Sequence, residues 1–237
     1  MKRQAWLNSA LISALAILPL AHAHDMPEPM PAQHQHAAPA SHDHSAHMAP
    51  PAPEQVPETV AVTVSNQPLN DQDGRSRRLK SELIGDRIAV VTFVYTSCTT
   101  VCPVVSSIMS DLQKKLGDRL DREVRLLSLS VDPARDTPSR LKSYAAQYET
   151  KPGWFWLTGP MASVTEVLTG FGAYTPNFEN HPVIVLIGDG RTGKWSRHYG
   201  LANADKLLAQ VDSYLAARQP RSPTRTVGGT PTRPGQS

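Results

Sequence analysis

The distribution of apolar residues predicts a series of strands that begins at about residue 58. Ile88 to Tyr95 is a nearly continuous apolar run, which is typical of a central strand covered on both faces. Val124 to Val131 predicts a second buried strand, and Trp154 to Leu157 predicts a short one. Val60 to Val64 alternates apolar and polar positions, so we expect a half-buried strand there.

Apolar residues at helical spacing predict four helices among these strands. The expected helices carry the stripe from Val104 to Leu116, run from Thr137-Pro138 to about Tyr148, carry Val164 to Phe171, and begin after Asn203. The turn-rich sequence GDGRTG predicts a hairpin between Val183 to Ile187 and Lys194 to Tyr199. Parallel crossovers followed by a hairpin indicate an α/β protein with a thioredoxin-like fold, in which helices cover both faces of a central mixed sheet.

The N-terminus has the features of a signal peptide. Lys2 and Arg3 precede a largely apolar run of 12 residues, Ala10 to Ala21, and Ala21-His22-Ala23 matches the small-x-small cleavage pattern. The run is short for a membrane span, which needs about 20 residues. We therefore expect residues 1–23 to be removed and the protein to be periplasmic. An uncleaved inner-membrane anchor, with membrane association, is the alternative.

Both ends of the remaining chain are expected to be disordered. Residues 24–57 contain eight prolines and few branched aliphatic residues, so burial there would not offset the entropy of ordering. Seven of the nine histidines lie at or just before this segment: His22, His24, His34, His36, His42, His44 and His47. We expect the segment to collect copper, or alternatively to act as an unspecific metal sponge or an inert spacer. The globular domain should span residues 58–218, with a basic tail at residues 219–237.

Charge adds little to this description. The formal net charge is +3, and several of the excess arginines lie in the C-terminal tail. For an exported protein with so modest a charge we expect no nucleic-acid partner.

The only two cysteines lie in the sequence TSCTTVCP, between a predicted buried strand and a predicted helix. Residues four apart on a helix face each other, so Cys98 and Cys102 can form a structural disulfide, a redox couple or half of a metal site. A disulfide over so short a loop restricts the unfolded chain little. Redox pairs more often have the spacing C-x-x-C. The helix N-terminus favours thiolates and an exposed, attacking Cys98.

Three blocks of the chain resemble the Sco/SenC family of copper chaperones for cytochrome c oxidase assembly. They are FVYTSCTTVCPVVSSIMSDLQKKLG, LSLSVDPARDTPSRLKSYA and NHPVIVLIGDG, in the family's order, within about residues 58 to 217. The resemblance implies a thioredoxin-like fold that binds one copper ion through Cys98, Cys102 and His181. It also implies that the protein delivers copper to the CuA centre of oxidase subunit II or keeps that centre reduced. Another copper acceptor is the alternative partner. Asp132 matches an acidic residue of the family.

Two other functions remain open at this point. The first is a thiol-disulfide oxidoreductase in which Cys98 attacks and Cys102 resolves. The second is a copper-resistance or storage protein that works mainly through the histidine-rich segment. Either copper exchange or disulfide chemistry would require a partner thiol reductant in an oxidising compartment.

Four further residues receive roles from their positions. We expect Asp132 and Asp136 either to cap the following helix or to support the metal site. His198 lies within a predicted strand and is expected to be structural. Because thioredoxin-like folds often have a cis-proline before this strand, we also expect a cis His181-Pro182 bond.

Overall fold

A computed structural model describes residues 57–219 of the chain, which fall within one compact unit. The predicted signal peptide, most of the histidine-rich segment and the basic tail lie outside these residues. Among residues 57–219, no helix is long and apolar enough to span a bilayer.

The centre of the domain is a six-stranded mixed sheet with the strand order β1-β8-β7-β4-β5-β6. Its strands are β1 (Glu58–Val60), β4 (Ile88–Val94), β5 (Val124–Ser130), β6 (Trp154–Leu157), β7 (Ile184–Asp189) and β8 (Trp195–Tyr199). β4, β5 and β6 run parallel, β7 is antiparallel to β4, and β8 pairs antiparallel with β7, as the predicted hairpin requires. The predicted strand order along the chain is therefore confirmed.

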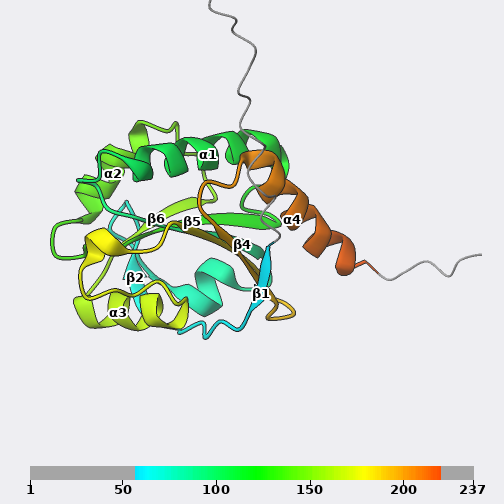
Figure 1. Ribbon diagram of the computed structural model, residues 1–237, viewed down its shortest axis with the longest axis horizontal. Helices are drawn as coiled ribbons and strands as arrows, with labels where there is room; N and C mark the ends of the chain where they lie inside the picture. Colours follow the sequence, from blue (N-terminus) through cyan, green and yellow to red (C-terminus); the bar gives the residue numbers. More distant parts are fainter. Residues whose placement is uncertain (1–56, 220–237) are drawn as a thin grey trace, which may run out of the picture. The chain divides into compact units, whose positions relative to one another are not determined.

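Helices cover both faces of this sheet (Figure 1). The helices are α1 (Val101–Leu116), α2 (Pro138–Ala146), α3 (Met161–Gly170) and α4 (Ala204–Ala217). One apolar cluster joins the sheet to α1, α2 and α4, and a second joins the opposite face to α3. Because β4 lies between these clusters, all seven of its residues are buried, which explains its nearly continuous apolar sequence. The expected fold class is confirmed.

The segment before β4 is more elaborate than the apolar pattern predicts. It contains a small hairpin of β2 (Pro68–Asn70) and β3 (Ser76–Arg78), followed by a π-helical turn, Leu79–Ile84. These strands have three residues each and are mostly polar, so they give no periodic signal.

The expected strand Val60 to Val64 is also only partly formed. β1 ends at Val60, and beyond it Thr63 donates its N–H to the carbonyl oxygen of Gly170 at 3.1 Å. A Cβ atom at position 170 would lie 2.1 Å from the Thr63 carbonyl oxygen, so this approach requires glycine. Val62 and Val64 still pack against the core. The alternating pattern therefore identified the half-buried side chains correctly, but the strand itself ends at Val60.

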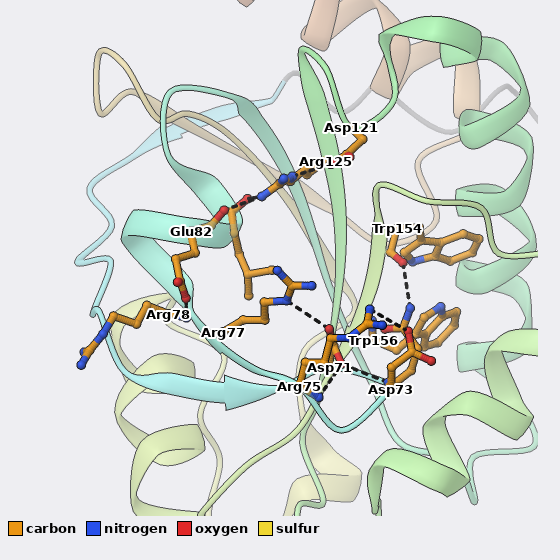
Figure 2. Close-up of polar contacts among 12 residues, drawn as sticks. Asp71, Asp73, Arg75, Arg77, Arg78, Glu82, Asp121, Arg125, Trp154 and Trp156 are labelled. Carbon is orange, nitrogen blue, oxygen red and sulfur yellow. Dashed lines mark hydrogen bonds and ion pairs between the residues drawn. The ribbon is translucent and has the colours of Figure 1, made fainter.

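Asp71 organises the β2–β3 hairpin, which is joined through Asn70 and Thr158 to the end of β6, an outer strand of the sheet (Figure 2). Its buried carboxylate accepts hydrogen bonds from the backbone N–H groups of Asp73 and Arg75 and from the Arg77 guanidinium. The next residue, Gln72, accepts a bond from the Trp156 N–H at 2.9 Å. The hairpin therefore covers an edge that would otherwise expose unpaired backbone groups.

Candidate metal centre

The topology brings the cysteine and histidine segments to one end of the sheet. Cys98 and Cys102 follow the C-terminal end of β4, and His181 precedes the N-terminal end of β7. Since β4 and β7 are antiparallel neighbours, with Thr92 opposite Val185, these two ends lie side by side. The sequence-predicted site residues therefore come from one region of the molecule.

Cys98 and Cys102 are free thiols that lie on either side of the start of α1. The backbone N–H of Cys102 donates to the Cys98 Sγ atom at 3.4 Å, and the Cys98 N–H donates to the Tyr95 carbonyl oxygen at 3.1 Å. Helix α1 thus directs one of its unpaired N-terminal N–H groups at a sulfur atom.

The exposure of Cys98 differs from the prediction. Cys98 is 5% exposed and Cys102 is 1% exposed, although Ser97, Thr99 and Thr100 around them face solvent. The expected exposure of Cys98 is therefore wrong for this conformation, and its role as an attacking thiol stays a prediction. The sequence pattern gave no sign of this burial, because the polar residues of the turn surround a sulfur that packs against the core.

The two thiols have very different acidities. Burial opposes ionisation of Cys98, but hydrogen bonds from Cys102 and Thr100 outweigh it and lower the pKa of Cys98 to about 7. Burial, together with the hydrogen bond to Cys98, raises the pKa of Cys102 to about 12. The pair therefore loses its first proton near neutral pH and holds its second strongly.

His181 is half-buried and keeps one ring nitrogen available. Its Nδ1 atom lies 3.2 Å from the Pro182 carbonyl oxygen, and a carbonyl can only accept, so Nδ1 carries the proton. Burial lowers the pKa of His181, which favours the neutral ring at pH 7. The Nε2 lone pair is therefore free to bind a metal ion. The described peptide bonds are all trans, so the expected cis His181-Pro182 bond is wrong.

Tyr95 connects the two segments and was not anticipated as part of the site. Its ring meets the His181 ring edge-on at 5.9 Å between centroids and the Phe178 ring at 5.1 Å. Burial and a hydrogen bond with Cys98 raise the pKa of Tyr95 to about 12. Within residues 57–219, no group of three or more His, Cys, Asp and Glu side chains is arranged to hold a metal ion. In this conformation His181 is packed against Tyr95, and the three-residue ligand set stays a prediction.

The two aspartates before α2 do not cap that helix. The cap is Thr137, whose side chain accepts from the Arg140 N–H. Asp136 instead accepts hydrogen bonds from Thr96 and Ser130, and Asp132 pairs with Arg135. A single sequence offers little to distinguish these roles, because aspartate is common both at helix starts and in buried polar networks.

His198 lies on β8 and is buried, with its pKa lowered first by burial and then by the charge of Lys206. This environment agrees with the structural role expected for it.

Comparison with known proteins places the chain in a family. Residues 59–216 match the family model described as SCO1/SenC, and the chain belongs to this family. Among curated proteins, it is 36% identical over 173 residues to "SCO1 protein homolog" of Bacillus subtilis, covering 68% of this chain and 86% of that protein.

Solved structures agree with this assignment. One of them is BsSco, a member of the Sco family of cytochrome c oxidase assembly proteins in which a disulfide switch was identified. It superposes on this chain with a TM-score of 0.56 at 30% identity. It covers 68% of this chain and 97% of that chain. Bradyrhizobium japonicum ScoI, solved with copper bound, gives a TM-score of 0.52 at 27% identity, covering 64% and 99%.

Proposed function

We propose that this protein is a periplasmic copper carrier that binds one copper ion through Cys98, Cys102 and His181. It would deliver that ion to the CuA centre of cytochrome c oxidase subunit II, or to another copper acceptor. The observation that carries the proposal is the thiol pair at the start of α1, with a neutral imidazole held at the same end of the sheet. Copper-bound Sco relatives and oxidase assembly relatives support it.

The donor set fits copper better than other common ions. Two sulfurs and one imidazole nitrogen are soft donors, and a set of three suits Cu(I). A structural zinc site would normally have a fourth ligand. The site is also suited to bind a metal ion at neutral pH, because the pKa of Cys98 is about 7 and its thiolate is therefore available.

Transfer would proceed by ligand exchange. The difference between the two thiols gives an order: Cys98 is ionised first, and Cys102 loses its proton when the ion arrives. Reversal of the second step returns a proton to Cys102 and frees a coordination position for an acceptor. His181 would have to leave its packing against Tyr95 to complete the set.

The direct test uses the mature protein, reduced and loaded with Cu(I) without oxygen. We expect one copper per chain, transfer to a soluble CuA domain, and no tight binding by a variant with both cysteines changed to serine. Equal copper retention by that variant would contradict the proposal. Fractionation of the producing cell, with N-terminal sequencing, tests the periplasmic location and cleavage after Ala23.

A thiol-disulfide oxidoreductase is the second candidate, because a thiol of pKa about 7 beside one of pKa about 12 also suits an attacking and resolving pair. Rapid reduction of a partner disulfide by a metal-free protein that does not bind Cu(I) tightly would favour this function.

The proposed role of the histidine-rich segment has its own test. Deletion of residues 24–50 should slow copper loading when copper is limiting, and unchanged loading would reject the role.

A further inference from the structure

The turn between β5 and α2 contacts both segments that carry the proposed ligands. We call residues 132–136 of this turn the β5–α2 loop. Its first residue, Asp132, is 5% exposed and follows the core residue Val131, just beyond the end of β5. Its last two residues, Arg135 and Asp136, are adjacent in sequence, yet one contacts the histidine segment and the other the cysteine segment.

Asp136 connects this loop to the cysteine segment. The carboxylate is 1% exposed and accepts from the Thr96 hydroxyl at 2.5 Å and from the Thr96 backbone N–H at 3.2 Å. It also accepts from the Ser130 hydroxyl at 2.6 Å, which ties it to the end of β5. Thr96 is two residues before Cys98, so these bonds fix the start of the turn that places both sulfurs.

Arg135 connects the same loop to the histidine segment. Its guanidinium lies over the Phe178 ring, 5.6 Å from the centroid, and pairs with the buried Asp132 carboxylate at 3.0 Å. Phe178 in turn packs against Tyr95 and accepts, through its carbonyl oxygen, the N–H of His181 at 3.1 Å. The ion pair with Asp132 therefore holds the Arg135 guanidinium over the Phe178 ring, and Phe178 is the first residue of the short turn that precedes His181.

We propose that the β5–α2 loop is a positioning element that sets the cysteine segment and the histidine segment relative to each other. Asp136 acts on the thiol pair through Thr96, and Arg135 acts on His181 through Phe178. The proposal rests on the proposed function for its effect on copper, but the two contacts are properties of the metal-free protein. Neither Asp136 nor Arg135 is expected to touch the ion.

Arg135→Gln tests the histidine side. The Arg135 side chain is 61% exposed, but it pairs with the buried Asp132 carboxylate, so urea denaturation must first show that the variant is folded at the temperature of the copper titration. We expect Cu(I) affinity to fall about tenfold, the lower end of the range for groups that orient metal ligands. The His181 imidazole resonances of the metal-free protein should also shift. The control is Arg122→Gln, whose side chain is 73% exposed and pairs with Glu123.

A double-mutant cycle separates positioning from a general effect. If Arg135 acts through His181, Arg135→Gln should cause no further loss of affinity in a His181→Ala background. Additive losses, or unchanged His181 resonances in the single variant, would overturn this half of the proposal.

Thr96→Val and Thr96→Ser test the cysteine side. Valine removes the hydroxyl donor, whereas serine keeps it. In the metal-free protein we expect the Cys98 and Cys102 amide protons to exchange at least about fivefold faster in the valine variant and at the wild-type rate in the serine variant. Equal exchange in all three proteins would overturn this half.

The measurements also separate this proposal from the proposed function. If the wild-type protein does not bind Cu(I) tightly, the copper-carrier function fails. The hydrogen-exchange and imidazole measurements would still decide whether the β5–α2 loop positions the two segments.

Discussion

The cysteine segment and the histidine segment lie at the same end of the sheet but are held in different ways. The cysteines are built into a strand-to-helix junction, where backbone bonds, the N-terminus of α1 and Asp136 fix their positions. The histidine segment contains only a short 3-10 turn, Phe178–Asn180, and the described backbone bonds of that turn are local. Its contact with the cysteine side is made by aromatic rings.

This difference suggests that the cysteines and the histidine have different roles in the proposed site. Backbone hydrogen bonds hold the two sulfur atoms in fixed positions. Ring contacts are weaker, so they allow the histidine to approach the sulfur atoms or to withdraw from them at little energetic cost. Variants on the two sides should therefore differ in kind: cysteine variants should remove binding, and histidine variants should weaken it.

Replacement of either cysteine should have the largest effect. We expect Cys98→Ser and Cys102→Ser each to reduce Cu(I) affinity at least about a thousandfold, a loss of about 4 kcal/mol. The reason is that serine offers a hard, protonated hydroxyl in place of a soft thiolate. Competition with a chromophoric Cu(I) ligand measures this, and retention of near wild-type affinity by either variant would argue against paired sulfur ligation.

Replacement of His181 by alanine should weaken binding without abolishing it. We expect a loss of about a hundredfold, or about 2.7 kcal/mol, because two sulfurs remain to hold the ion. The same titration measures it, with Asn180→Ala as the neighbouring control. If the Cu(I) affinity falls as far as in the cysteine variants, the difference in roles described above is contradicted. If the affinity does not fall, His181 is excluded as a ligand.

A stability variant away from the site should leave copper binding unchanged. Arg218 pairs with the buried Asp189 carboxylate at 2.6 Å and joins the end of α4 to β7. Arg218→Gln should lower the free energy of unfolding by about 3 kcal/mol, because it leaves a buried charge without its partner. Urea denaturation tests this expectation. A parallel loss of Cu(I) affinity in the folded variant would mean that the site depends on the whole domain more than the structure indicates.

The smallest effect concerns pH. Because the thiolate is the reactive form and the pKa of Cys98 is lowered to about 7, its alkylation by iodoacetamide should rise between pH 6 and pH 8 and then level off. The increase should be about tenfold, with Cys102 unmodified over this range because its pKa is raised. Mass spectrometry after timed alkylation follows both sites, and equal modification of the two would contradict the assigned asymmetry.

The apolar pattern predicted most of the fold because the domain is built around long buried runs. β4 and β5 lie within the core and gave nearly continuous apolar runs, and α1, which packs one apolar stripe on them, gave a clear helical period. The β2–β3 hairpin gave none, because its order depends on the polar contacts of Asp71. The Thr63–Gly170 contact was also invisible, because it depends on a distant backbone approach.

The sequence placed the cysteine pair correctly at a helix start, but it did not predict the neighbours or the geometry of the candidate site. The spacing of Cys98 and Cys102 indicated paired sulfurs at a helix start, and the structure places them there. The roles of Tyr95 and Asp136 depend on which segments meet at the end of the sheet, and no local pattern reports that. An aromatic residue at the end of a central strand looks like one more core position in the sequence.

The burial of both sulfurs has a consequence for the kinetics of any reaction at them. Cys98 is 5% exposed and Cys102 is 1% exposed, so a reagent or acceptor reaches the sulfur atoms only when the residues around them move, and access becomes a separate step before bond formation. Compact molecules would need a smaller opening than bulky ones, so the rate of opening would help to decide which partners react.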